Sequence, residues 1–295
     1  MQTGYFSAAW RDVKNSPGWF GKVAILGLVG LVTVFGQIVA YGYLFGWARD
    51  ISWGVHAPLP PRIFGNEDGA LYRRGFFAFV IVFVCSLMPW ALGMVWGVLT
   101  GLGAFWSARG GFAVAFGPAM MMLWLLFAAA VVLSLLFSWV GTMRMSIYGR
   151  LAPGFQFGRI WAMMRRDFGG LLRILGMAVF LMVATGVVVW AATLAITLAG
   201  ALAGVVIGTP VVSTNNPFVL MATVPGLVAL VMILVVACAV LSTAAGAFSM
   251  ALIARALGYW TRQFDVPSWH GQDDPMPFEM TGGPCPAQTP PSNRG

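Results

Sequence analysis

Between Arg173 and Arg255 the chain runs for 81 residues without one Asp, Glu, His, Lys or Arg. Over the whole chain only 9% of residues are charged and 59% are hydrophobic, whereas a water-soluble domain carries roughly a quarter charged residues. In lipid every backbone polar group must be bonded within the protein, and continuous apolar runs achieve this as helices. The sequence therefore excludes a soluble globule and predicts an all-α, polytopic transmembrane bundle.

Five apolar runs are long enough to cross a membrane, since about 20 helical residues cover the hydrocarbon layer. They are residues 23–47, 75–105, 117–140, 171–200 and 220–254. We predict one transmembrane helical domain over residues 1–264, without a cleavable signal peptide. The proline-rich tail, residues 265–295, is expected to be disordered.

The positions of Lys and Arg indicate which runs cross. If all five cross, 13 basic residues lie on one face and 4 on the other; if the first run enters and returns, the split is 16 against Arg109 alone. Because cytoplasmic loops carry the basic excess, we favour four spans plus a re-entrant helical hairpin at residues 23–47, turning at Gly36-Gln37. Both termini are then cytoplasmic, in a bacterial inner membrane. Five spans with the N-terminus outside is the alternative, which run length alone supports.

Two stretches, residues 4–15 and 155–168, have apolar side chains at helical spacing, which is typical of helices lying on a bilayer surface. In the second stretch one face carries Phe157, Trp161, Met164 and Phe168. Its basic residues, expected to contact anionic headgroups, are Arg159, Arg165 and Arg166. An ordinary interfacial anchor is favoured over a helix that binds a specific lipid or partner. The net charge of +8 is attributed to this cytoplasmic face and not to nucleic-acid binding.

Glycines recur at four-residue spacing in two of the runs. They are Gly93, Gly97 and Gly101, then Gly200, Gly204 and Gly208. Such stripes let helix backbones approach closely in lipid. We expect them to pack helices within one protomer, with a dimerisation face as the alternative.

The sequence shows no constellation of catalytic, cofactor-binding or metal-binding residues. The apolar runs lack the ionisable groups that ion-coupled transport, proton relays and intramembrane proteolysis use. The loop set His56, Glu67 and Asp68 and the tail set His270, Asp273 and Asp274 have no spacing that specifies a metal site. We therefore predict no enzyme, no cofactor and no metal.

A motif follows the first apolar run. The segment from Tyr41 to Asp50 is followed by Leu59-Pro60 and, at the next helix, by Gly75. This pattern resembles domain-of-unknown-function family 4013, uncharacterised bacterial multi-pass membrane proteins, over about residues 5–260. The residues that carry the resemblance are Gly42, Tyr43, Arg49, Leu59, Pro60 and Gly75. The resemblance implies a multi-pass membrane protein and supplies no activity.

Two hypotheses for function remain open. The first is a non-enzymatic bilayer component that contacts anionic lipids, a membrane protein partner or a second copy of itself. The second is a permease or channel for a neutral or lipid-like solute. Its path would be lined by hydroxyls such as Thr185, Thr193, Thr197, Ser242, Thr243 and Ser249. Those hydroxyls can equally bond their own helix backbone, which is the interpretation we favour.

Overall fold

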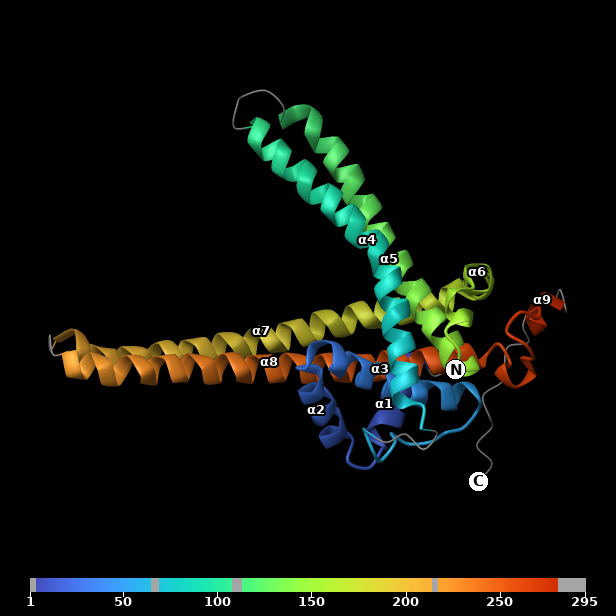
Figure 1. Cartoon of the computed structure of the whole chain (residues 1–295), viewed down its shortest axis with the longest axis horizontal. Helices are drawn as coiled ribbons and strands as arrows, with labels where there is room; N and C mark the ends of the chain where they lie inside the picture. Colours follow the sequence, from blue (N-terminus) through green and yellow to red (C-terminus); the bar gives the residue numbers. More distant parts are fainter. Residues whose placement is uncertain (1–3, 65–68, 108–112, 214–216, 281–295) are drawn as a thin grey trace.

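The computed structural model describes residues 4–64, 69–107, 113–213 and 217–280, and within them every regular element is a helix (Figure 1). The α-helices are α1 (Tyr5–Lys14), α2 (Trp19–Gly30), α3 (Thr33–Ser52), α4 (Leu71–Ser107), α5 (Ala113–Tyr148), α6 (Phe157–Arg166), α7 (Phe168–Ser213), α8 (Pro217–Arg262) and α9 (Pro277–Met280). Two short 3₁₀ helices, η1 (Ala152–Phe155) and η2 (Val266–Ser268), complete the described part. The predicted all-α fold is confirmed, and each of the four predicted spans lies within a longer helix.

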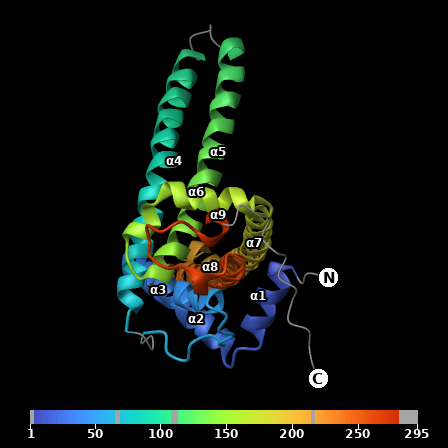
Figure 2. The ribbon, with the colours of Figure 1, turned by 90° about the vertical axis from the view of Figure 1, so that its right-hand side faces the viewer.

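Two long helical hairpins project from a compact base (Figures 1 and 2). One hairpin is α4–α5 and the other is α7–α8, and they leave the base in different directions. The base consists of α1, α2, α3, α6 and the inner ends of the four hairpin helices, with α6 lying across the foot of α4–α5 (Figure 2). In α8, the inner end packs against α1, α2, α3 and α5, which makes it the central helix of the base.

Four helices are long and apolar enough to cross a membrane: Leu71–Leu102, Met120–Tyr148, Phe168–Ala201 and Val228–Arg262. Their outer parts expose large apolar side chains, including Met122 at 77% and Met182 at 75% of full exposure. With 46 residues, α8 measures about 69 Å at the α-helical rise, more than twice the hydrocarbon thickness of about 30 Å. Only the outer part of each helix therefore needs lipid around it, because the inner part is covered by the base.

The first apolar run is not one continuous helix. It breaks at Leu31-Val32, where α2 ends and α3 begins, so the structure has a helix-turn-helix in place of the alternative single span. The predicted turn at Gly36-Gln37 is corrected, because the chain reverses five residues earlier. Gly36 still matters: a Cβ there would lie 2.8 Å from the Cα of Gly30, so its lack of a side chain lets α3 start directly against the end of α2.

Backbone contacts at glycines hold α2 and α3 against α8. A Cβ on Gly27 would lie 2.5 Å from the Cα of Ala244, and a Cβ on Gly258 would lie 2.5 Å from the carbonyl oxygen of Ala48. Real Cβ atoms do not approach other atoms this closely, so glycine is required at both crossings. The rings of Trp47 and Trp260 are both fully buried in the base.

The prediction of a disordered tail is corrected for residues 265–280. This segment folds back on the base, where Val266, Trp269 and Met276 are buried. The indole of Trp269 stacks on Tyr148 with 6.0 Å between ring centroids, and its Nε1 donates to the carbonyl of Phe264 at 2.9 Å. Apolar side chains spaced along a polar segment thus suffice to dock it. Residues 281–295 fall outside the described part of the chain.

Candidate functional site

The guanidinium of Arg255 is the centre of a buried polar cluster in the base. Its Nε donates to Oδ2 of Asp12 at 2.6 Å, and one terminal nitrogen donates to the carbonyl of Trp47 at 3.0 Å. It also stacks over the Trp47 ring, with 4.3 Å between Cζ and the ring centroid. The hydroxyl of Tyr259 donates to the same Asp12 oxygen at 2.8 Å. The cluster ties α1 and α3 to α8.

His56 extends this cluster toward solvent. Its Nε2 lies 3.0 Å from a guanidinium nitrogen of Arg262, and its ring lies 6.3 Å from that of Tyr259. Burial and then the charge of Arg262 lower the pKa of His56, against an opposite effect of Asp12. A neutral ring at neutral pH can accept the hydrogen bond from Arg262, and that bond is lost when the pH falls below the lowered pKa.

Two of the motif glycines face each other where α3 crosses α4. A Cβ on Gly42 would collide with the carbonyl oxygen of Leu71, and a Cβ on Gly75 would collide with that of Ile38. Each added Cβ would also lie 3.1 to 3.2 Å from the backbone nitrogen of the other glycine. The motif spacing therefore places two glycines at one backbone-to-backbone contact.

Three further motif residues fix the loop between α3 and α4. The hydroxyl of Tyr43 donates to the carbonyl of Pro60 at 2.8 Å. Leu59 is 2% exposed, its N–H donates to Oγ of Ser16 at 2.9 Å, and its carbonyl accepts from Nζ of Lys22 at 2.8 Å. Five motif residues therefore hold α3, the loop and α4 together at one place, called here the corner. They are Gly42, Tyr43, Leu59, Pro60 and Gly75.

The sixth motif residue, Arg49, lines a half-enclosed cavity of about 220 Å³. The cavity is lined by Arg49, Ala70, Arg73, Arg74, Phe77, Met145 and Gly149, contributed by the ends of α3, α4 and α5. Arg49 also pairs with Asp50 at 3.2 Å. Sequence reasoning missed Arg73 and Arg74, although two adjacent arginines at the start of an apolar helix are a readable signal.

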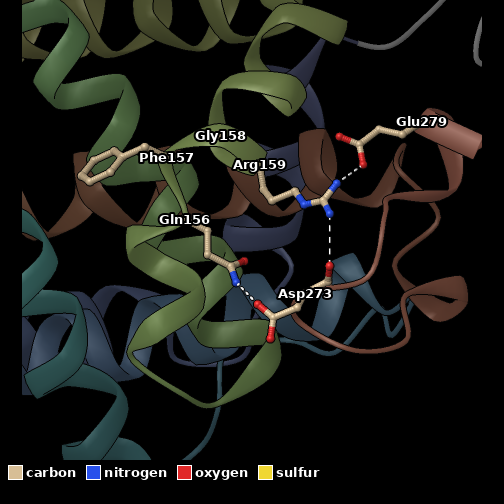
Figure 3. Close-up of a pocket in the computed structure, with 6 residues that line it drawn as sticks. All are labelled: Gln156, Phe157, Gly158, Arg159, Asp273 and Glu279. Carbon is tan, nitrogen blue, oxygen red and sulfur yellow. Dashed lines mark hydrogen bonds and ion pairs between the residues drawn. The ribbon is translucent and has the colours of Figure 1, made fainter.

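A second, wider pocket of about 470 Å³ lies between α6 and the docked tail (Figure 3). Arg159 forms an ion pair with Glu279 and donates to the carbonyl of Asp273 at 3.1 Å. The side-chain amide of Gln156 donates to a carboxylate oxygen of Asp273 at 2.8 Å and accepts from Arg144 at 2.6 Å. Arg159 was expected to face lipid headgroups; in the structure it holds the tail.

The apolar face of α6 differs from the predicted one. The fully buried side chains are Ile160, Met163 and Met164, whereas Phe157, Trp161 and Phe168 are each about half exposed. Trp161 stacks on Phe137 of α5 with 6.2 Å between ring centroids. Because α6 packs on the base with the face that carries Ile160, Met163 and Met164, its aromatic residues lie on a different face. Beside them Arg165 is exposed, and Arg166 stacks against Phe278 at 5.9 Å.

Each glycine stripe has one member that closely faces the other helix of its hairpin. Gly93 faces Phe127 of α5 at 3.4 Å and Gly200 faces Leu234 of α8 at 2.7 Å, both measured from an added Cβ. Gly97 and Gly101 have nothing within 4 Å of such an atom. Gly204 and Gly208 lie where side chains are not described. Among the four stripe glycines whose surroundings are described, Gly93 and Gly200 therefore pack inside a hairpin.

Hydroxyls in the apolar helices bond their own backbone. Thr185 donates to the carbonyl of Leu181 at 2.7 Å, Thr193 to Val189 at 2.7 Å, and Thr243 to Ala239 at 3.0 Å. Thr197 and Ser249 do the same.

Within the described residues no group of three His, Cys, Asp or Glu side chains could hold a metal ion.

Comparison with known proteins gives one match. A family model described as protein of unknown function (DUF4013) matches residues 25–194, more than half of the chain. The matched segment begins in α2 and ends in α7, so it contains all six motif residues. No curated protein and no solved structure matches the chain.

Proposed function

Since the chain belongs to the DUF4013 family of proteins of unknown function, which has no activity to transfer, we propose its role from its own geometry. It is a non-enzymatic component of the bilayer, held there by two helical hairpins. The positively charged residues of the compact base recognise anionic lipid headgroups on the cytoplasmic side. The family and the four apolar helices establish an integral membrane protein; the lipid contact and the orientation are the proposal.

The separation of apolar and basic surfaces carries the proposal. The outer parts of the hairpins expose residues such as Trp90 and Trp190, at 69% and 67%. Of the 17 Lys and Arg residues, Arg109 alone belongs to a connection at the outer end of a hairpin. A basic face next to apolar spans is the arrangement that attracts anionic headgroups and keeps that face in the cytoplasm.

The α2–α3 turn supports a third, shallower contact with lipid. Five apolar residues around the turn are 42% to 57% exposed: Leu28, Leu31, Val32, Val34 and Phe35. In the base of a soluble protein they would be left in water, whereas in a bilayer they enter the hydrocarbon edge.

The proposed orientation predicts which positions a membrane-impermeant thiol reagent can reach. In a variant without its native cysteines, single cysteines replace Thr3, Gly110, Asn215 or Pro290. Labelling of intact cells is expected only at Gly110 and Asn215, because these positions lie in the sequence between the two helices of each hairpin. Labelling at Thr3 and Pro290 is expected only after the membrane is opened. External labelling at Thr3 together with protection at Pro290 would instead establish five crossings.

Lipid recognition is tested with the full chain reconstituted in mixed vesicles of phosphatidylcholine and phosphatidylglycerol. Spin-labelled lipids of the two kinds report how much of each is immobilised at the protein surface. Phosphatidylglycerol is expected to be enriched about fivefold, the factor that corresponds to about 1 kcal/mol for a basic residue near an anionic surface. The enrichment should shrink in 0.5 M salt because exposed charges are screened. Equal immobilisation of both lipids would reject the proposal.

A further inference from the structure

We propose that residues 271–279 of the docked tail, called here the strap, cover a surface formed by Arg144 and Arg159 that binds anionic lipid headgroups, and that these headgroups displace the strap. This inference rests on the proposed contact with anionic lipid and adds its regulation. Figure 3 shows the strap held by Gln156 and Arg159 at the start of α6. In this closed form the chain covers the surface with its own acidic side chains.

Arg144, at the inner end of α5, is fully buried among neutral groups. Its guanidinium donates to the side-chain oxygen of Gln156 at 2.6 Å and to the carbonyl oxygens of Pro153 and Gln272 at 3.4 and 3.5 Å. Within the part of the chain that the structure describes, it forms no ion pair. A buried cation is costly unless an anion pairs with it, so an anion at this place would bind strongly.

The negative charges that face these two arginines belong to the strap. Glu279 forms an ion pair with Arg159, which also donates to the carbonyl of Asp273 at 3.1 Å. The carboxylate of Asp273 accepts from the amide of Gln156 at 2.8 Å, and Gln156 in turn accepts from Arg144. Lifting the strap removes both carboxylates. Headgroup phosphates can then replace them, because guanidinium groups donate strong, charge-assisted hydrogen bonds to phosphate.

The strap has little buried surface of its own. Met276 is its one buried residue, at 3% exposure, whereas residues 273–275 are exposed and Phe278 is half-buried. Polar contacts between partly exposed side chains contribute little to stability. Val266 and Trp269, which precede the strap, are buried in the base. The strap can therefore lift while the first part of the tail stays docked.

Arg144 lies at the depth of lipid headgroups. From Met120, the first residue of the second candidate span, to Arg144 the helix measures about 36 Å at the α-helical rise. This exceeds the hydrocarbon thickness of about 30 Å but not the 40 to 45 Å of a bilayer with its headgroup layers. Beside it α6 lies across the foot of the α4–α5 hairpin (Figure 2) and half exposes Trp161, a residue type enriched at membrane interfaces.

The pocket between α6 and the strap gives a headgroup its first contact. It measures about 470 Å³ and is lined by Gly158 and Arg159 of α6 and by Asp273 and Glu279 of the strap (Figure 3). A phosphate that enters here meets Arg159 while Arg144 is still covered. A ligand shifts an equilibrium only by its differential affinity for the two forms. Anionic lipid favours the lifted form because the strap occupies both arginines in the closed one.

A cysteine in place of the buried Met276 reports how often the strap lifts. The full chain without its native cysteines and with Met276→Cys is placed in nanodiscs of phosphatidylcholine, with or without phosphatidylglycerol, and its reaction rate with an uncharged maleimide is measured. Pro275→Cys, at an exposed position of the same strap, is the matched control for access of the reagent. Phosphatidylglycerol is expected to raise the ratio of the two rates about tenfold.

Arg159→Gln is compared with Arg150→Gln, which removes the same charge from an exposed arginine for which the described residues show no contact with the strap. Without Arg159 the strap loses its ion pair, so the ratio in phosphatidylcholine should rise up to about fivefold. The further rise with phosphatidylglycerol should fall below about threefold, because one of the two arginines is gone. Arg150→Gln should change either ratio by less than about twofold. Circular dichroism and elution volume verify that both variants fold.

Further arms separate the possible sources of the anion. Inorganic phosphate at millimolar concentration and constant ionic strength is expected to leave the ratio in phosphatidylcholine unchanged, since it is not held at the membrane. A rise equal to that with phosphatidylglycerol, or equal effects of the two variants, would overturn the assignment, as would a wild-type ratio that ignores phosphatidylglycerol. The proposed function fails differently, because the wild type would then show no enrichment of phosphatidylglycerol in vesicles. If the strap alone is wrongly assigned, that enrichment persists.

Discussion

Replacing Gly75 with alanine is expected to destabilise the base by more than about 3 kcal/mol, the upper part of the range for overpacked sites. The new Cβ would collide with the carbonyl oxygen of Ile38 and lie 3.1 Å from the backbone nitrogen of Gly42. Both are backbone atoms, which cannot rotate away as a side chain can. The crossing of α3 and α4 must therefore open, and with it the corner fixed by Tyr43 and Pro60.

The matched control is Gly97→Ala on the same helix. Nothing lies within 4 Å of a Cβ at this position, and the gain in helix propensity, about 1 kcal/mol, is the same for both replacements. Thermal unfolding of the full chain in detergent, followed by circular dichroism, should show a lowered midpoint for Gly75→Ala and an unchanged or raised midpoint for Gly97→Ala. Equal midpoints would mean that α3 and α4 do not approach as closely as the structure has them.

The sequence predicts the spans well because insertion into lipid depends on the local apolar content of a run. Hydropathy located five apolar runs and the positions of Lys and Arg favoured four of them as spans; each of these four helices extends beyond its predicted bounds. The motif residues were likewise identified from the sequence, but their structural role was not. That Gly42 meets Gly75 depends on how the intervening loop folds. No local pattern encodes that approach.

What the sequence does not predict depends on contacts between distant segments. The turn at Leu31-Val32 lies five residues from the glycine that permits it. The tail looked disordered because its composition is polar, yet Trp269 and Met276 dock it near Arg144. Asp12 and Arg255 lie 243 positions apart in sequence, and neither has a neighbour that indicates a pairing. Only the folded base brings their charges together.

The pair of Asp12 and Arg255 gives the second large effect. Replacing Arg255 with methionine keeps much of the side-chain volume but leaves the carboxylate of Asp12 without its 2.6 Å partner and removes the cation over the Trp47 ring. Breaking a buried ion pair from one side costs about 3 to 5 kcal/mol. We expect a loss of this size in the free energy of unfolding in detergent, against less than about 0.5 kcal/mol for the exposed Arg150→Met.

A double-mutant cycle shows whether the charges or the apolar contacts hold α1 in place. Asp12→Asn alone leaves the guanidinium buried without its counter-charge, whereas Asp12→Asn with Arg255→Met removes both charges. If the ion pair holds the helix, the double variant should recover about 1 to 3 kcal/mol relative to the sum of the single losses, because the penalty for an unpaired charge disappears. Additive losses would show instead that Ala9 and Val13, both buried against the base, hold α1 and that the ion pair contributes only orientation.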